Sequence, residues 1–384
     1  MPYSVKPQKR KNHSPSFYQL TLPLQKILNS ITPLVSKGNK RLKMSFQDQL
    51  NALIFFHLEE HHSGRHLLQA LKEDNFAINH IAPEKGIEKS SFFEAINNRG
   101  IEQLMEVFHA LYKEAVNVLP KEYVDLGDLI AIDGSLIDAT LSMNWADYRD
   151  GAKKAKAHLG FDINYGIPSK IFLTNGKEDE RPFVSKILSP GQTGVLDRYY
   201  QCHANFDQWQ KKGIHFICRI KSKTTKTIIS SYAVKPESIV FYDALVFLGT
   251  PGVNQTEKPV RLVGYKIDNV NYWVATDRFD LSAEQVASAY KLRWAIESFF
   301  AWWKRHLKVY HLIARSRYGL MVQILSGLIT YILLAIYCHN NYKEKVSIRR
   351  VRQLRIQIQN EAGMSDSIKQ NQINPLPFLS NAKT

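Results

Sequence analysis

The spacing of hydrophobic positions divides the chain into a helical first part and a mixed second part. Between residues 46 and 116 apolar side chains recur at helical intervals, as in Leu50, Leu53 and Leu58, which predicts several amphipathic helices. From about residue 126 short apolar runs alternate with turn signals, which is typical of buried strands. The organisation of the chain therefore changes near residue 120.

The second part predicts an ordered series of elements. The order is three strands, a helix, a strand, a helix, a strand, a β-rich insert over about 222–276 and a long helix over about 283–307. Ser282 and Gln285 have the spacing of a capping box, which predicts where the long helix begins. The strands before the insert are expected in 128–139, 156–164, 169–175, 193–200 and 214–222.

Residues 320–338 imitate a membrane span. The segment has the length and apolar character needed to cross a bilayer. Gln323, Ser326 and Thr330 interrupt it, however, and a helix buried on all sides in a large core has the same composition. We favour the core helix over the membrane span.

Charge narrows the choice of partner. The chain carries a formal net charge of +16, which indicates a polyanion, most commonly nucleic acid. Residues 1–45 contain no acid, and a second basic cluster holds four arginines between Arg349 and Arg355. Both segments suit contacts with phosphates, and both suit a solvated tail equally well. The start of the chain has no apolar signal, and three cysteines without a CxxC pair favour a reducing, cytoplasmic location.

The helical first part has two further features. A short helix carrying Asn97, Asn98 and Arg99 after a turn suits a helix-turn-helix that reads DNA, and it suits a plain helical bundle as well. Histidines spaced four apart suit a metal on a helix face, but we favour solvated or capping histidines. These histidines are His57, His61, His62 and His66.

Two acids end apolar runs in the second part. Asp133 follows Leu129–Ile132, and Asp197 follows Gly194–Leu196. A buried strand acid needs a partner, and a bound cation is one such partner. Either acid alone is also compatible with an ordinary turn. The two acids by themselves therefore do not distinguish a cation site from a pair of turn-forming aspartates.

Four polar residues share one side of the predicted long helix. At about 100° per residue, Tyr290, Arg293, Glu297 and Lys304 fall on one narrow stripe opposite an aromatic face. A solvated face with an ordinary Arg293–Glu297 ion pair gives the same pattern.

This stripe also spells a known signature: Tyr, two residues, Arg, three residues, Glu, six residues, Lys. With IDGSLIDA, LDRYY and FDLSAEQVASAYKLRWAIESFF around the acids, the sequence resembles bacterial insertion-sequence transposases of the DDE type, in the family named for the fourth insertion sequence. The resemblance covers roughly residues 45–340. One position differs from the family pattern: Tyr199 follows Asp197 and Arg198 where the family often has glycine.

The resemblance implies an α/β fold, a ribonuclease H-like mixed sheet with helices and a β-rich insertion before the last catalytic helix. It is preceded by a helical N-terminal DNA-binding region. We therefore expect a basic arm at 1–45, a helical DNA-binding region at 46–120, a catalytic domain at 121–340 with its insertion at about 222–276, and a basic tail at 341–384.

The resemblance also implies an activity, namely metal-dependent cleavage at transposon ends and strand transfer into target DNA. Asp133, Asp197 and Glu297 would be catalytic and hold two Mg²⁺ ions, with Mn²⁺ able to substitute. Tyr290, Arg293 and Lys304 would bind DNA. Expected partners are double-stranded DNA, as end repeats and as target, and a second copy in a homodimeric end complex. No membrane is expected, and the location is the cytoplasm with the nucleoid.

Two alternative functions stay open, beside the membrane protein considered above. Another ribonuclease H-like nuclease would need the acids but not the rest of the stripe. A catalytically inactive DNA-binding relative would not need the acids, although all three are present. Trp273 in the insert is a candidate to hold a base out of the DNA stack, but we favour a packed strand tryptophan.

Overall fold

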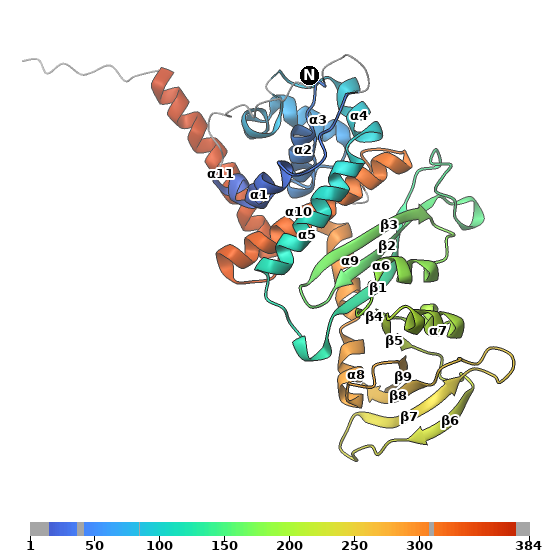
Figure 1. Cartoon of the computed structure of the whole chain (residues 1–384). Coiled ribbons are helices and arrows are strands. Elements are labelled where there is room, and N and C mark those ends of the chain that lie inside the picture. The colour runs from blue at the N-terminus through green and yellow to red at the C-terminus, as the bar shows by residue number, and fades with distance from the viewer. Residues whose placement is uncertain (1–14, 37–41, 84, 307–310, 374–384) are drawn as a thin grey trace, which may run out of the picture. The chain divides into compact units, whose positions relative to one another are not determined.

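The computed structural model describes residues 15–36, 42–83, 85–306 and 311–373 (Figure 1). It forms two compact units, which are described separately. The first comprises the described parts of 1–111, 306–314 and 318–384, and the second comprises 112–305 and 315–317. The outer parts of the predicted basic arm and tail, 1–14 and 374–384, lie outside the described residues.

The first unit is helical, as the spacing of apolar residues over 46–116 predicts. A π-helix over Ala77–Ile81 lies between its third and fourth helices. The α-helices that belong to it wholly or in large part are α1 (Pro15–Leu28), α2 (Phe46–Leu58), α3 (Gly64–Glu73), α4 (Lys89–Asn98), α5 (Ile101–Val118), α10 (Arg317–Tyr342) and α11 (Ile348–Ile373).

The membrane-like segment is the buried helix α10 of this unit. Of the described helices it alone is long and apolar enough to cross a bilayer, and 89% of its most apolar stretch is buried. Its polar residues meet partners inside the unit, because the Nε2 of His57 lies 3.1 Å from both the backbone oxygen of Gln323 and the Oγ of Ser326. The prediction of a core helix is confirmed.

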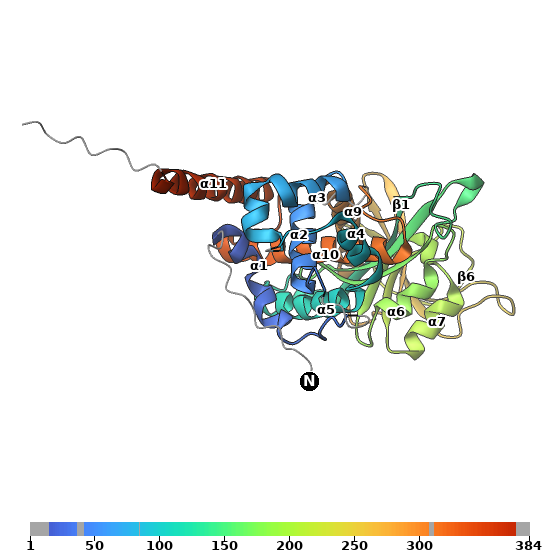
Figure 2. The same cartoon turned by 90° about the horizontal axis from the view of Figure 1, so that it is seen from above.

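Parts of the basic arm and tail are folded. Helix α1 buries Phe17 and Leu20 and lies beside α11 (Figure 2), where Ser16 Oγ donates a 2.6 Å hydrogen bond to Glu361. In the tail, Arg350 pairs with Glu344 at 2.6 Å. Around these contacts the arm and the tail are therefore part of the folded helical unit.

The expectation of solvated histidines is wrong at two positions. His57 is fully buried against α10, and His61 is 6% exposed, with neither ring nitrogen hydrogen bonded in the part of the chain that the structure describes. The spacing of these histidines predicts that they lie on or just after a helix. It does not show which face of that helix other helices cover. Within the described residues no group of three His, Cys, Asp or Glu side chains has the spacing of a metal site.

The second unit is built on one nine-stranded sheet in the order β3-β2-β1-β4-β5-β9-β8-β7-β6. Strand β1 pairs with β4 in parallel and with β2 antiparallel, while β4 and β5 are parallel. The strands are β1 (Leu129–Asp138), β2 (Lys154–Asp162), β3 (Ile167–Asn175), β4 (Thr193–Leu196), β5 (His215–Arg219), β6 (Lys226–Ser231), β7 (Val240–Leu248), β8 (Val260–Ile267) and β9 (Val270–Thr276).

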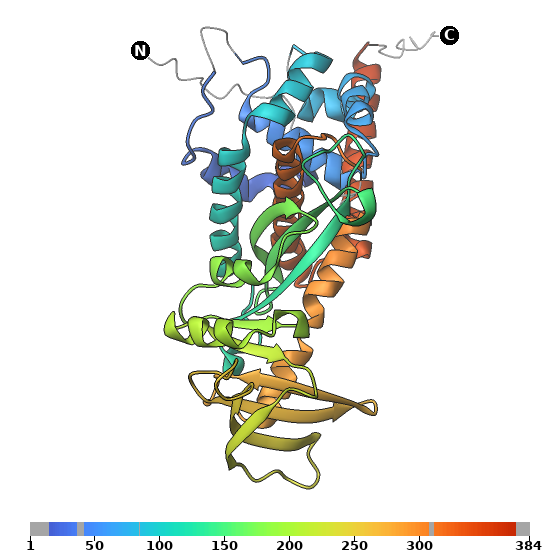
Figure 3. The same ribbon diagram turned by 90° about the vertical axis from the view of Figure 1, so that its right-hand side faces the viewer.

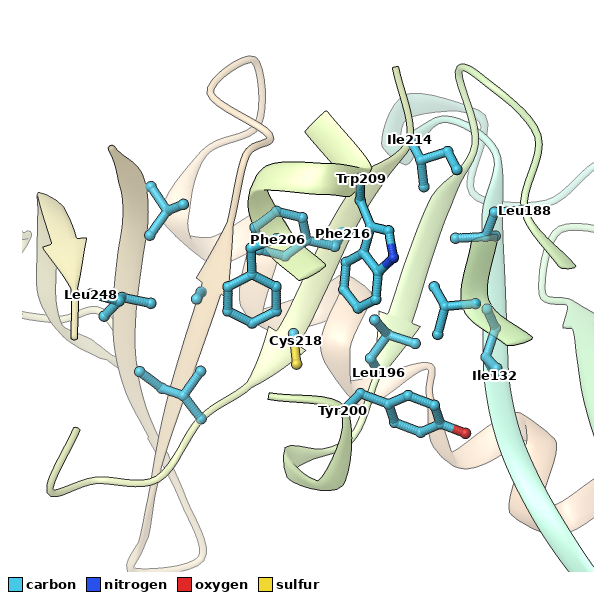
Figure 4. Packing of buried hydrophobic residues seen from close by; sticks show 14 of the residues in the cluster. Ile132, Leu188, Leu196, Tyr200, Phe206, Trp209, Ile214, Phe216, Cys218 and Leu248 are labelled. Carbon is cyan, nitrogen blue, oxygen red and sulfur yellow. The ribbon is translucent and has the colours of Figure 1, made fainter. Parts of the chain in front are cut away.

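Helices cover the two faces of this sheet. Figures 1 and 3 show α6 (Val184–Ile187) and α7 (His203–Lys211) on one face, and α8 (Ala283–Lys291) and α9 (Trp294–His306) on the other. Side chains alternate along a strand, so successive residues serve opposite faces. Ile132 and Leu196 pack under Trp209 of α7 (Figure 4), whereas Phe161 meets Phe299 of α9 at 5.0 Å between ring centroids.

The β-rich insert extends the central sheet instead of forming a separate layer. Strands β6 to β9 pair antiparallel with one another, and β9 joins them to β5. Trp273 of β9 lies against Phe241 and Tyr242, with ring centroids 5.3 and 5.1 Å away, and Lys226 Nζ is 5.0 Å from its ring. This packing favours the interpretation of Trp273 as a packed strand tryptophan.

The order of elements is the one that the sequence predicts, with a mixed sheet, the first acid after the start of β1 and the second at the end of β4. The predicted α/β fold, a mixed sheet with helices and a β-rich insertion before the last helices, is confirmed. The predicted long helix over 283–307 is wrong as a single element. Its start is right, because Ser282 and Gln285 form the capping box of α8.

Helices α8 and α9 are separated at Leu292–Arg293. There the backbone changes to i→i+3 hydrogen bonds, from Arg293 N to Tyr290 O at 3.0 Å and from Ala295 N to Leu292 O at 3.0 Å. Such a turn is tighter than an α-helical turn and advances the side chains further around the axis. The stripe calculated for an unbroken helix therefore holds only approximately.

The environment of His61 makes the helical unit sensitive to acid. Burial, followed by the charges of His66 and His62, lowers the pKa of His61 from its ordinary 6.5 to about 4. The unfolded chain binds this proton more readily than the folded unit does. The contribution of the neutral His61 ring to the free energy of unfolding is therefore complete above pH 6.5 and is lost as the pH falls towards 4. Between pH 7 and 5 this loss is about 2 kcal/mol.

We expect His61→Phe to keep the aromatic packing and to remove this pH-dependent loss. Denaturant unfolding at pH 7 and pH 5 measures it, with His109→Phe at an exposed position of α5 as the matched control. Equal losses in the wild type and in His61→Phe would show that His61 does not cause the acid sensitivity.

Candidate active site

The register of β1 and β4 positions two acids side by side. Ala131 pairs with Val195 in the parallel ladder, and Asp133 and Asp197 each follow two residues later. Ala131 also pairs with Phe161, the β2 residue that meets α9. Because residues two apart share a face, Asp133 points to the side of the sheet covered by α9.

The surroundings of Asp133 are unusual for a strand acid. Burial, the Glu180 carboxylate and the Asp197 carboxylate raise its pKa from the ordinary 3.8 to about 7, against the lowering effects of the Gly134 N–H and Arg293. Its Oδ1 accepts a 2.8 Å hydrogen bond from that N–H. Like charges that crowd a half-buried carboxylate disfavour its ionised form, and a nearby cation would restore it.

Asp197 is held at the end of its strand by a helical cap. It is the N-cap of the short 3-10 helix Arg198–Tyr200, and its Oδ1 accepts a 2.7 Å hydrogen bond from Tyr199 N. Tyr199 takes the place where glycine is common in the resembling family, and here it lies in this helix with a side chain 53% exposed. The departure therefore leaves the position of Asp197 intact.

Glu297 lies on α9 and is bound by an arginine. Arg293 Nη2 donates to Glu297 Oε1 at 2.6 Å, and the guanidinium lies 5.9 Å from the ring centroid of Tyr290. The same Arg293 is close enough to lower the pKa of Asp133. Tyr290 is only 5% exposed, and the guanidinium of Arg293 lies over its ring.

Lys304 lies further along α9. It is seven residues beyond Glu297, which on an α-helix is a rise of about 10 Å. Its side chain is partly exposed, while the neighbouring Trp303 is fully buried. The structure thus brings Asp133, Asp197 and Arg293 together, links Glu297 to them through Arg293, and leaves Lys304 at the next stretch of the helix.

Glu180 is a carboxylate at the site that the sequence analysis missed. It precedes the 3-10 helix Arg181–Phe183, and its side chain is 16% exposed. Its Oε1 lies 3.2 Å from Lys156 Nζ, and its Oε2 accepts a 3.0 Å hydrogen bond from the Tyr200 hydroxyl. No local pattern marks it, because it follows the exposed turn after β3 among other acids.

Two other acids have structural roles. Asp162 accepts a 2.6 Å hydrogen bond from the Tyr112 hydroxyl and another at 3.0 Å from Asn164 N. Asp207 accepts from the backbone N–H groups of Glu257 and Lys258 at 3.0 and 3.1 Å. Since both acids already stabilise loops, neither replaces Asp197 as a candidate.

The donors at the site suit a hard divalent cation. Carboxylate oxygens are the ligands that Mg²⁺ prefers, and crowded carboxylates beside a single arginine call for further positive charge. Within the described residues, no three of the acids have the spacing of a metal site, and Glu297 is instead paired with Arg293. The residues fit such an ion in chemistry, although Glu297 would have to leave its arginine to reach it.

Comparison with known proteins gives relatives of one kind. The chain is 26% identical over 196 residues to a probable transposase for insertion sequence element IS5377 of Geobacillus stearothermophilus, covering 50% of this chain and 51% of that protein. It is 24% identical over 261 residues to a putative transposase for insertion sequence element IS4SA of Synechocystis, covering 65% and 71%. The match thus spans about half the length of the first relative.

Among solved structures, the piggyBac transposase synaptic complex with hairpin DNA aligns with 97% of this chain and 87% of that one, at 11% identity and a TM-score of 0.43. So loose a likeness contributes nothing to the assignment. The decisive match is to the family model described as the transposase DDE domain, which covers residues 125–333 and includes Asp133, Asp197 and Glu297. Since this is more than half of the 384 residues, the chain belongs to the transposase DDE domain family.

Proposed function

We propose that this protein is a DNA transposase that cleaves DNA at the ends of a mobile element and joins those ends to target DNA. The observation that carries the proposal is the family match over a sheet in which Asp133 and Asp197 each follow, by two residues, the last paired residue of two adjacent parallel strands. The net charge of +16 suits a DNA partner. We further propose that it works as a homodimer on paired ends, in the cytoplasm with the nucleoid.

The proposed cofactor is a divalent metal, namely two Mg²⁺ ions that Mn²⁺ can replace. Such ions, when bound, would activate the attacking hydroxyl and stabilise the leaving oxygen of a phosphodiester. Asp133, Asp197 and Glu297 would hold them. Arg293, released from Glu297, would bind a DNA phosphate with its planar guanidinium, and the buried Tyr290 would keep that guanidinium in place.

Residues 46–120 are the proposed region that recognises the element's ends. The exposed basic residues Arg65 on α3 and Lys89 on α4 offer contacts with phosphates. The alternative is that this region is only a helical bundle and that recognition lies in the insert. A different enzyme of the same fold class would cleave DNA without strand transfer.

The three acids should be needed for chemistry and not for binding. We expect Asp133→Asn, Asp197→Asn and Glu297→Gln each to lower cleavage of end DNA by about 10³-fold or more, because each removes a metal ligand. DNA affinity should stay near that of the wild type. Asp179→Asn, which neutralises an acid already paired with Arg181 at 2.8 Å, is the matched control. Near-normal cleavage by any of the three variants would remove that residue from the site.

Exposed basic residues of the helical region should contribute to end binding. Deleting the region would expose the core it shares with α10, so substitution is the cleaner test. Arg65→Ala with Lys89→Ala should weaken end binding and reduce the slope of log affinity against log salt by about two. A gel-shift titration at several salt concentrations measures both. If neither the affinity for end DNA nor the salt slope changes, these basic residues do not contact the ends.

Lys304 should separate transposition from plain nuclease activity. A nuclease needs the carboxylates, whereas a transposase must also hold one end through successive steps. Losing a charge-assisted hydrogen bond to phosphate costs about 1.5–3 kcal/mol, which is roughly a tenfold to hundredfold loss. We expect Lys304→Ala to lower strand transfer relative to first-strand nicking by this factor. The adjacent, exposed Arg305→Ala is the control. An equal loss in both steps, or in neither, would contradict an end-holding role.

A further inference from the structure

Glu180 is a largely buried carboxylate of the second unit, with its side chain 16% exposed, that the proposed three-acid site does not use. It lies in the turn between β3 and the helix that begins at Arg181, distant in sequence from Asp133 and Asp197. Its contacts bring it to the strand that carries Asp133 and to the short helix that Asp197 caps. The Tyr200 hydroxyl bonded to it at 3.0 Å belongs to the short helix capped by Asp197.

The side of Glu180 that faces β1 meets a glycine. A Cβ placed on Gly134 would collide with all three atoms of the Glu180 carboxylate. The residue next to Asp133 must therefore lack a side chain for Glu180 to occupy this position. The carboxylate of Asp133 is itself turned towards residue 134, because its Oδ1 accepts from Gly134 N at 2.8 Å. Two carboxylates thus lie around the backbone of one glycine.

The electrostatics of Asp133 agree with this proximity. After burial, Glu180 has the largest effect of any charged side chain on the pKa of Asp133, ahead of Asp197 and Arg293. Lys156, 8% exposed, supplies the nearby countercharge at 3.2 Å from Glu180. One lysine beside Glu180 and one arginine beside Glu297 leave Asp133 and Asp197 without a full countercharge of their own. Keeping a fourth acid in such surroundings costs stability unless a cation binds there.

We propose that Glu180 is a fourth carboxylate of the metal site and that it binds the ion held by Asp133, directly or through a water ligand. This inference rests on the proposed function, since it presupposes a metal at Asp133. The alternative role is structural, in which Glu180 only fastens the turn before Arg181 to Tyr200 and Lys156.

Mn²⁺ binding to the full-length protein separates the two roles. Free Mn²⁺ is measured by electron paramagnetic resonance during titration, so that the readout does not depend on activity. Glu180→Gln should weaken Mn²⁺ binding by about 10- to 100-fold, as expected for a residue in or next to a metal's ligand shell. Asp179→Asn, the neighbouring acid paired with Arg181, should leave it within about twofold.

Two further variants exclude a merely structural effect. Tyr200→Phe removes a hydrogen bond to Glu180 but keeps its charge, so Mn²⁺ affinity should stay much closer to the wild type than in Glu180→Gln. Gly134→Ala should displace the carboxylate and weaken binding, yet add little in the Glu180→Gln background, since the two changes act on one contact. If Glu180→Gln lowers the melting temperature while Mn²⁺ affinity stays within about twofold, the structural role is correct and this inference is overturned.

The proposed function fails differently. If Asp133→Asn leaves Mn²⁺ binding unchanged, there is no metal site at Asp133, and the proposed function and this inference both fall. If Asp133→Asn abolishes binding and Glu180→Gln does not alter it, only the role of Glu180 is wrong.

Discussion

The parallel pairing of β1 with β4 is the constraint on which the site depends. It sets two acids level with each other at the same edge of the sheet, because Ala131 pairs with Val195 and each acid follows two residues on. A shift of one residue in this register would turn one acid to the opposite face. The apolar residues that precede the acids fix the register, since Ile132 and Leu196 must both reach the core under α7.

That apolar core is also what allows the charged edge to exist. Crowded carboxylates repel, and this repulsion adds to the effect of burial in raising the pKa of Asp133. The neighbouring cluster of Phe206, Trp209 and Phe216, with the stacked rings of Phe206 and Phe216 only 4.4 Å apart, binds β5 firmly to α7. The stabilising apolar packing thus lies beside the site. It offsets the cost of the crowded carboxylates, which the site retains for its chemistry.

The sequence predicted those parts of the molecule that local patterns determine. Apolar runs locate the strands, a capping box locates the start of α8, and the ends of two apolar runs locate Asp133 and Asp197. The break between α8 and α9 was missed, because Leu292 and Arg293 are ordinary helix formers and only the hydrogen bonds show the tight turn. Glu180 was missed because tertiary contact alone brings it to Gly134, although a glycine directly after a strand acid was a signal that something approaches there.

The Arg293–Glu297 pair bears on how the site is assembled. On an exposed helix an i,i+4 pair contributes little, but here the arginine side chain is 15% exposed, rests over Tyr290 and acts on Asp133. A buried arginine needs an anion, and Glu297 supplies it in the protein alone. A DNA phosphate is also an anion with the geometry that a guanidinium binds. Exchange of one for the other would free the Glu297 carboxylate where the proposed metal needs it, so that binding of DNA would complete the ligand set.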